Sequence, residues 1–318
     1  MAYTGKRATA AQLIDERGRF VIDGSMSSLL ERYGADLNDP LWTAKVLLEQ
    51  PELVKRVHTA YFRAGADCGI TCSYQATIAG LMKKGLTEAQ SEEVIKNSVE
   101  IFLQAREEWW EEEGKSAHRA WPLCLGACGP YGAYLADGSE YRGNYGIGAE
   151  ELRGFHFRRA QLLWEAGADM LLFETQPSLG ETLVETDIAA ELGAPCWVSY
   201  SCKDEAHTCE GQDIADCARA MAQRPCVKVI GVNCTAPHLI EPLITRIKSA
   251  CGLPIAVYPN SGKTYDPLTK TWTGKGDVAG FGESAVRWFG AGASAVGGCC
   301  TTSDEHIRAV CGALDALD

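Results

Sequence analysis

Three cysteines in the second half of the chain offer the clearest chemistry in the sequence. Cys299 and Cys300 are adjacent and follow Gly297 and Gly298, and Cys234 ends an earlier apolar run. Neighbouring side chains of a regular strand point to opposite faces, so two adjacent cysteines can share one ion only where a strand ends. The glycines would let the backbone turn and a ligand approach closely. Three thiolates about 2.3 Å from Zn²⁺, with an open fourth position, are typical of a catalytic zinc site.

Two other interpretations of these cysteines stay open at this point. They could be small side chains that fill a buried space, or Cys299 and Cys300 could form a disulfide with each other. Other metal motifs have no support, because the sequence contains neither CxxC nor HExxH.

Two acidic residues stand at the predicted ends of other strands. Asp23 follows the first apolar run, and Glu174 ends the fourth. Two carboxylates at one edge of a sheet could act as a general acid and base, or could hold the ammonium group of an amino-acid substrate. Asp23 also suits the N-cap position of the helix that follows it, which would give it a structural role.

A long segment rich in glycine and tyrosine, from 129 to 146, follows the third apolar run. Its tyrosines are Tyr131, Tyr134, Tyr141 and Tyr145. A long ordered connection of this kind is commonly a lid or a binding loop. An inert surface loop would give the same pattern.

Short apolar runs alternate with longer amphipathic segments along the whole chain, which indicates alternating strands and helices. An Ala-Gly-Ala sequence at 64–66, 166–168 and 291–293 ends a helical pattern and leads into a strand, with glycine where a helix stops in a left-handed conformation. The pattern predicts an α/β fold, a single (β/α)₈ TIM-type barrel, with an open doubly wound sheet as the alternative. Chemistry in such a barrel lies at the C-terminal ends of the strands. The predicted strands are 20–23, 68–73, 123–128, 170–175, 196–201, 227–234, 255–260 and 295–300.

Composition and charge exclude several classes of protein. Of 318 residues, 46% are hydrophobic and 23% charged, as in an average globular protein. The formal net charge of −12 would repel a phosphate backbone, so nucleic acid is not an expected partner. The sequence predicts no membrane helix and no secretory signal, so we expect a cytoplasmic protein whose 14 cysteines are reduced. Without a linker, 1–318 is expected to form one domain, with 1–19 as an N-terminal extension.

A set of motifs spread along the chain carries a resemblance to a known family. The set is DGSM at 23–26, LWTAK at 41–45, SYQAT at 73–77, GPYGAYLADGSEYRG at 129–143, ET at 174–175, VNC at 232–234, VYPNSG at 257–262 and GGCC at 297–300. Together they resemble the homocysteine S-methyltransferases, and most closely the cobalamin-independent enzymes that use S-methylmethionine. The likeness extends from about Phe20 to Cys311.

The resemblance implies a homocysteine-binding barrel domain with one Zn²⁺ held by Cys234, Cys299 and Cys300. It further implies a protein oxygen in the fourth zinc position until homocysteine displaces it, for which Asn260 is our candidate. Two departures from the family pattern are Ser25, where alanine is common, and Thr301, where arginine often follows the cysteine pair.

The resemblance also implies where the substrates bind. Asp23 and Glu174 would hold the homocysteine amino group, and backbone amides near Gly24 and Met26 its carboxylate. Further homocysteine contacts are expected at Trp42, Ser73 and Asn233, and methyl-donor contacts at Tyr74, Gln75, Tyr131 and Tyr134.

The implied reaction is zinc-dependent transfer of a methyl group from a sulfonium donor to homocysteine, which gives methionine. Zinc deprotonates a bound thiol, and the thiolate is the nucleophile. The expected partners are therefore small molecules: homocysteine, and S-methylmethionine or S-adenosylmethionine. Alternatives are methylation of selenocysteine or another thiol, and a noncatalytic zinc or redox sensor in which Cys299 and Cys300 pair reversibly.

Overall fold

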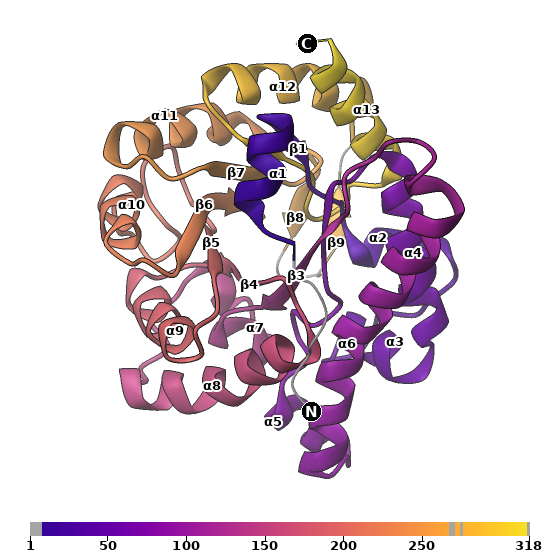
Figure 1. Cartoon of the computed structure of the whole chain (residues 1–318). Helices are drawn as coiled ribbons and strands as arrows, with labels where there is room; N and C mark the ends of the chain where they lie inside the picture. Colours follow the sequence, from indigo (N-terminus) through magenta and orange to yellow (C-terminus); the bar gives the residue numbers. More distant parts are fainter. Residues whose placement is uncertain (1–7, 267–270, 274–275, 317–318) are drawn as a thin grey trace.

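Eight parallel strands close into a barrel surrounded by helices (Figure 1). The computed structural model describes residues 8–266, 271–273 and 276–316, so 1–7 of the expected N-terminal extension and the last two residues lie outside the described part. The strand order is β1-β10-β7-β6-β5-β4-β3-β2, and a parallel bridge between Ile22 and Cys68 joins the two ends. The predicted (β/α)₈ barrel is confirmed, and the open doubly wound alternative is wrong.

All eight predicted strands are present, most of them shorter than expected at the C-terminal end. The predicted functional residues lie at or just beyond these ends, and Glu174 and Asn233 are still within β4 and β6. Two further strands, β8 and β9, pair with each other outside the barrel. The strands are β1 (Phe20–Val21), β2 (Cys68–Ile70), β3 (Leu123–Cys128), β4 (Met170–Gln176), β5 (Cys196–Tyr200), β6 (Val227–Asn233), β7 (Ile255–Tyr258), β8 (Thr264–Asp266), β9 (Thr271–Thr273) and β10 (Ala295–Val296).

Most of the helices pack around the outside of the barrel (Figure 1). No helix within the described residues is long and apolar enough to cross a membrane. The α-helices are α1 (Ala10–Arg17), α2 (Met26–Arg32), α3 (Thr43–Glu49), α4 (Pro51–Ala64), α5 (Ile78–Lys83), α6 (Glu88–Trp109), α7 (Tyr131–Leu135), α8 (Ala149–Ala166), α9 (Leu179–Glu191), α10 (Ile214–Ala222), α11 (Ile240–Ala250), α12 (Val278–Ala291) and α13 (Asp304–Asp315). Shorter helical segments are the π-helix η1 (Trp110–Gly114) and the 3₁₀-helices η2 (Ser139–Tyr141) and η3 (Pro237–Leu239).

The repeated Ala-Gly-Ala sequences end helices α4, α8 and α12 as expected. Gly65, Gly167 and Gly292 have φ of 113°, 111° and 126°. In each case the N–H of the following alanine bonds back to the helix, as when Ala168 donates to the Leu163 carbonyl. This arrangement is a Schellman motif, which only glycine forms without strain.

Successive side chains along each strand alternate between the interior of the barrel and the layer between the strands and the helices. Leu123 and Leu125 of β3 point inward, whereas Cys124 packs outward. At the N-terminal end of the barrel, Ala10 and Leu13 of α1 close this interior cluster, and Figure 1 shows α1 in front of the strands. The predicted functional residues lie at the opposite end, where the strands terminate.

Candidate active site

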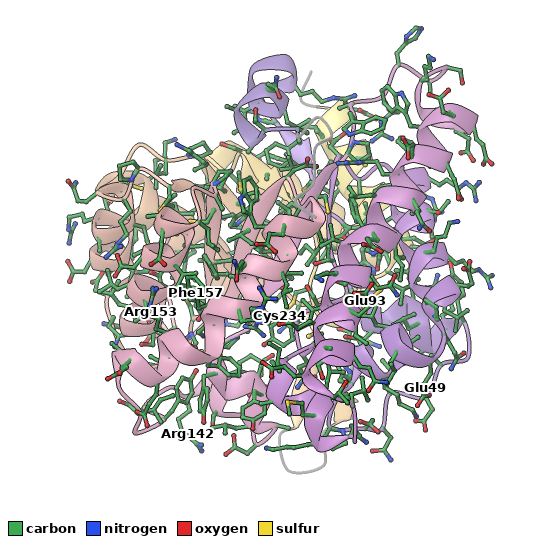
Figure 2. All side chains as sticks on the ribbon, turned by 60° about the horizontal axis from the view of Figure 1, so that its bottom comes forward. Glu49, Glu93, Arg142, Arg153, Phe157 and Cys234 are labelled. Atoms are coloured by element: carbon green, nitrogen blue, oxygen red, sulfur yellow. A yellow bond between two sulfur atoms is a disulfide. The ribbon has the colours of Figure 1, made fainter. Side chains whose placement is uncertain are left out.

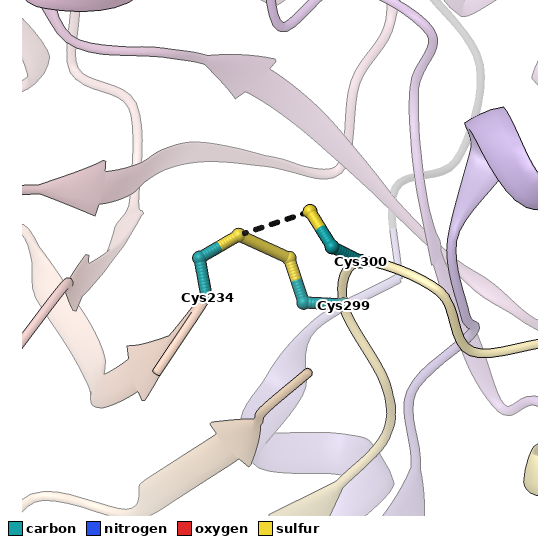
Figure 3. A group of neighbouring side chains, drawn as sticks. All are labelled: Cys234, Cys299 and Cys300. Atoms are coloured by element: carbon teal, nitrogen blue, oxygen red, sulfur yellow. Dashed lines mark hydrogen bonds between the residues drawn. A yellow bond between two sulfur atoms is a disulfide. The ribbon is translucent and has the colours of Figure 1, made fainter. Parts of the chain in front are cut away.

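Three thiols meet at the C-terminal end of the barrel. Cys234 follows β6, and Cys299 and Cys300 follow β10 (Figure 3). Their Sγ atoms all lie within 4.8 Å of one another. Cys234 and Cys299 form a disulfide, and the Cys300 Sγ lies 3.8 Å from that of Cys234. The expected alternative of a Cys299–Cys300 disulfide is therefore wrong, because each of these side chains turns toward Cys234 rather than toward its neighbour.

The backbone around the thiols is held in uncommon conformations. Cys234 has φ of 46° and Thr301 has φ of 63°, in the left-handed region that non-glycine residues rarely adopt. Thr301 Oγ1 donates to the Cys300 carbonyl (2.6 Å). Protein packing requires the two preceding glycines: a Cβ on Gly297 would lie 2.5 Å from that of Ile22, and one on Gly298 would lie 2.4 Å from Thr302 Oγ1.

The donor set fits a thiolate-bound zinc ion once the disulfide is reduced. Sulfur atoms each about 2.3 Å from a tetrahedral zinc lie about 3.8 Å apart, which matches the separation of Cys234 and Cys300. Without a cation, burial raises the pKa of Cys300 to about 12, so three thiolates in this space need a compensating positive charge. Asn260 Oδ1 is buried without a hydrogen-bond partner among the described residues. Its role as fourth ligand stays a prediction.

Two buried carboxyl groups lie on the same end of the barrel. Asp23 is 2% exposed and Glu174 is 6% exposed. The Ile70 N–H donates to Asp23 Oδ2 (2.9 Å), while Asp23 Oδ1 has no hydrogen-bond partner among the described residues. Burial raises the pKa of Glu174 to about 8, against a lowering by the nearby Tyr258 hydroxyl. Burial, with a smaller effect of Glu174, also raises the pKa of Asp23 well above its usual range.

These carboxyls can bind a cation. A positive group between them would favour their ionised forms and offset the desolvation that raises both pKa values. The N-cap alternative for Asp23 is wrong, because Ser25 is the N-cap of α2 and its Oγ accepts from the Ser28 N–H (3.3 Å). This capping role also accounts for serine at position 25.

Three thiols beside two buried carboxyls is the arrangement that the sequence motifs predicted. Known proteins are similar to this chain over nearly its whole length. A model of the homocysteine S-methyltransferase family matches residues 20–314. The chain is 46% identical over 299 residues to homocysteine S-methyltransferase YbgG of Bacillus subtilis (strain 168), covering 94% of this chain and 95% of that protein. The chain belongs to the homocysteine S-methyltransferase family.

Solved structures of one homocysteine methyltransferase, MmuM from Escherichia coli, are also similar. Its metallated form aligns with a TM-score of 0.85 and 39% identity, covering 94% of this chain and 97% of that chain. Its oxidised form aligns with a TM-score of 0.85 and 38% identity, covering 96% and 98%. The family predicted from the motifs is therefore confirmed, and with it the assignment of this chain to a family of methyltransferases.

Other residues predicted to contact homocysteine are engaged by the protein itself. Asn233 holds Thr175 at two points: its Oδ1 accepts from the Thr175 N–H (2.7 Å), and its Nδ2 donates to Thr175 Oγ1 (2.8 Å). Asn233 Nδ2 also lies 3.9 Å from Cys299 Sγ. Ser73 Oγ donates to the Ala127 carbonyl (2.7 Å) and is buried. Their contacts with homocysteine stay predictions.

The remaining predicted homocysteine contacts lie around the same end of the barrel. Gly24 packs on the ring of Tyr61, and Met26 is the first residue of α2. Trp42 precedes α3 with φ of 48°, and its ring stands edge-on to that of Tyr74 at 6.3 Å. Homocysteine contacts by Gly24, Met26 and Trp42 stay predictions.

The residues predicted to contact the methyl donor divide into two groups. Tyr74 lies near the site, because the charges of Glu140 and Glu174 act on its hydroxyl and raise its pKa beyond the effect of burial. Gln75 Nε2 donates to the Ala133 carbonyl in α7 (2.9 Å) and so ties two loops together.

Tyr131 and Tyr134 instead pack on α8. Their ring centroids lie 5.0 Å and 5.4 Å from that of Phe155, and Lys83 Nζ lies 4.4 Å from the Tyr134 ring. A donor contact by either ring stays a prediction.

Tyr141, one of the four tyrosines of the segment 129–146, is the one that reaches the cysteines. Its hydroxyl lies near the Cys300 thiol and lowers the pKa of that thiol against burial, which places η2 over the cysteines. Thr175 and Tyr258, which flank Glu174, had no role predicted from the sequence. Both stand in the motifs that carry the family resemblance, and that was the available signal. Spacing alone does not show their place, because the closure of the barrel brings them to the site.

Proposed function

We propose that this protein transfers a methyl group from a sulfonium donor to the sulfur of homocysteine, with Zn²⁺ held by Cys234, Cys299 and Cys300. The observation that carries the proposal is the convergence of three thiols beside the buried Asp23 and Glu174. Membership of the homocysteine S-methyltransferase family supports the same reaction. The metallated state named for the Escherichia coli relative supports a metal at these cysteines.

The chain's own residues orient the substrates. Asp23 and Glu174 bind the ammonium group of homocysteine, since a charge-assisted hydrogen bond to each is stronger than a neutral one. This contact directs the substrate thiol toward the cysteine cluster on the same end of the barrel. The chemistry that zinc supplies when bound is the deprotonation of a coordinated thiol, which makes it a nucleophile at neutral pH. No general base is then required at the methyl group.

The donor side of the site suits a compact cation. A sulfonium is attracted to aromatic faces by about 0.5–2 kcal/mol per ring, depending on desolvation, and Trp42, Tyr74 and Tyr141 supply such rings. Glu140 adds negative charge on the same loop. S-Methylmethionine carries a compact sulfonium, whereas S-adenosylmethionine adds a nucleoside that must fit beneath the same loop. We therefore propose S-methylmethionine as the better donor.

The test combines metal analysis with methyl transfer. The reduced protein should bind about one zinc per chain and form methionine from homocysteine. Both donors are crossed with homocysteine, selenocysteine and other thiols, which separates the proposed reaction from methylation of another acceptor. Single replacements of Cys234, Cys299 or Cys300 by alanine should remove zinc and turnover together.

Cys251→Ala is the matched control, because Cys251 lies at the end of α11, away from the cluster. It should keep both zinc and activity. Full zinc content and turnover in all three cluster variants would refute the proposal.

A further inference from the structure

A second cluster of titratable side chains lies outside the cysteine site. His156 and Arg159 of α8 and Glu181 of α9 are each 1% exposed or less. The His156 Nε2 and Glu181 Oε1 atoms are 2.8 Å apart, and Arg159 Nη2 lies 3.1 Å from His156 Nδ1. Burial of three such groups raises the free energy of the folded protein unless they are paired, so we expect this cluster to have a role.

The hydrogen bonds fix the state of the histidine. Arginine has donors only, so His156 Nδ1 must accept from Arg159, and the ring proton is on Nε2, where it is donated to Glu181. Burial lowers the pKa of His156, in keeping with a neutral ring. Glu185 Oε1 lies 3.4 Å from His156 Nδ1 and accepts from Gln176 Nε2 (3.1 Å).

A metal ion is not the best occupant of this cluster. The ligand atoms of His156, Glu181 and Glu185 lie within 4.8 Å of one another. A divalent cation among them would have to break the bond between His156 and Glu181 and lie next to the Arg159 guanidinium. The existing bonds already satisfy both ring nitrogens.

What the cluster does hold is the loop that follows β3. Glu181 Oε1 also accepts from the Tyr131 N–H (2.6 Å), in the first turn of α7. Arg159 Nη2 donates to the Gly129 carbonyl (2.6 Å), and its Nη1 lies 3.5 Å from the Tyr74 carbonyl. The cluster therefore fixes the backbone at the start of the segment 129–146 and beside the predicted donor residue Tyr74.

The same segment is held near its far end by the neighbouring βα unit. Glu210 Oε1, from the loop after β5, accepts from the Asn144 N–H (2.7 Å). Between the two attachments, Ser201 Oγ lies 3.4 Å from the Glu140 carbonyl. Figure 2 shows Arg142, within this segment, at the lower edge of the molecule, with Cys234 behind the helices. The stretch between the anchors carries η2, which lies over Cys300.

We propose that Glu181, His156 and Arg159 are positioning residues that set the place of the segment 129–146 over the cysteine site, and thereby the use of the methyl donor. The effect on the donor rests on the proposed function, whereas the effect on the segment does not. Glu181 holds the segment directly, and His156 keeps the Glu181 carboxylate in place. Arg159 holds His156 and the Gly129 carbonyl at the start of the segment.

The test uses Glu181→Gln in the full, zinc-loaded protein, with two readouts. Hydrogen exchange should become at least about tenfold faster in peptides covering 129–146, because a charge-assisted bond to the Tyr131 amide is weakened. The kcat/KM for S-methylmethionine should fall about tenfold, while the homocysteine KM and zinc content stay as in the parent. A merely structural role would change all of these together.

The matched control is Glu191→Gln, the same change on the same helix. Glu191 pairs with Arg153 of α8 (2.7 Å) but is 54% exposed, and Figure 2 shows Arg153 on that helix. It should change neither readout. Arg159→Gln, which frees the Gly129 carbonyl without touching the Tyr131 amide, gives a second variant if Glu181→Gln does not fold, and should act in the same direction.

Unchanged exchange in both cluster variants would overturn the proposal. So would a second zinc ion per chain that Glu181→Gln removes, since the cluster would then be a metal site. Faster exchange in 129–146 without turnover by the parent from any donor would support the anchor and contradict the proposed function, so the two failures can be distinguished.

Discussion

At the scale of single residues, the site is built from strained positions that neighbouring side chains hold in place. Thr175, Cys234 and Thr301 all have positive φ, which costs of order 1–3 kcal/mol for a non-glycine residue. Asn233 holds Thr175 through two hydrogen bonds, and Ser261 bonds to the Thr301 hydroxyl. Such strain persists only where the surroundings compensate for it, and here it sets the direction of Glu174 and of the three thiols.

Glu174 should make the substrate-free protein less stable as the pH rises. Its pKa in the folded state is about 8, above the ordinary 4.5, so the folded state holds the proton more tightly than the unfolded state. The stabilising contribution is complete below about pH 4.5 and is lost as the pH rises to about 8, with a slope of at most about 1.4 kcal/mol per pH unit. Denaturant unfolding of the parent and of Glu174→Gln at several pH values measures this slope.

Binding of an ammonium group should reverse the effect. Methionine carries this group without a free thiol, so its binding at pH 7 should release protons from Glu174 alone or with Asp23. Calorimetry in buffers of different ionisation enthalpy counts them. Asp23 titrates in the same direction, so Glu174→Gln should reduce the slope and the proton release without abolishing them. Equal values in parent and variant would assign the titration elsewhere.

The residues of the site were unequally predictable. Cys234, Cys299 and Cys300 could be predicted as a group because parallel strands of a barrel end on one side. The disulfide between Cys234 and Cys299 could not, because the choice of partner depends on how the chain turns after β10. The contacts of Asn233 and Ser73 were equally hidden, since a polar side chain at a strand end can face a ligand or a neighbouring strand.

At the scale of elements, the segment after β3 is folded tightly on itself. A Cβ added to Gly132 in α7 would lie 2.5 Å from the Glu140 N atom, 2.6 Å from the Ser139 carbonyl carbon and 2.8 Å from the Tyr145 ring. Two of these contacts are backbone and cannot rotate away. Glycine is therefore required where α7 crosses η2, and this close approach keeps η2 over Cys300.

Gly132→Ala should displace η2 and impair the use of the donor. Overpacking of this kind costs about 1–3 kcal/mol, and a displacement of about 1 Å at a reacting centre can lower the rate by about 100-fold. We expect kcat/KM for S-methylmethionine to fall at least about tenfold, with zinc content unchanged.

Gly154→Ala in α8 is the control, because a Cβ there meets nothing within 4 Å. Initial rates and metal analysis of the two variants decide the matter, and parental donor kinetics in Gly132→Ala would show that η2 has no part in donor binding.

The elements were predictable where one local rule governs them. The Ala-Gly-Ala sequences end their helices because the glycine adopts one left-handed backbone conformation. The strand β3 has the bounds that the sequence predicts. The strands β1 and β10 are two residues long, because the chain bends toward the site immediately after the barrel closes. The tyrosines of the segment 129–146 suggested a uniform lid, but Tyr131 and Tyr134 pack on Phe155 while Tyr141 lies near the thiols. Helical packing outside the barrel decides this, and no short pattern reveals it.

At the scale of the whole molecule, hydrogen bonds that stabilise the barrel lie at its N-terminal end, and the candidate active site lies at its C-terminal end. The aspartates that follow two of the Ala-Gly-Ala sequences join the segments at the N-terminal end. Asp67 accepts from the Val21 N–H (3.0 Å), and Asp169 accepts from the Cys124 N–H (2.8 Å) and the Ala8 N–H (2.9 Å). Each bond crosses to a different strand or to the segment before α1, at the end opposite the cysteines.

Asp169→Asn should therefore destabilise the protein and leave the site intact. Asp169 and Arg106 form an ion pair with side chains 0% and 2% exposed, and removing the negative partner leaves a buried guanidinium, which typically costs about 3–5 kcal/mol. The control is Asp216→Asn, which breaks an exposed pair with Arg219 and should change the free energy of unfolding by less than about 1 kcal/mol. Denaturant unfolding measures both, and methyl transfer well below the unfolding midpoint should match the parent. A loss of turnover in folded Asp169→Asn would show that the two ends of the barrel are coupled, whereas parental stability would mean that Arg106 finds another partner.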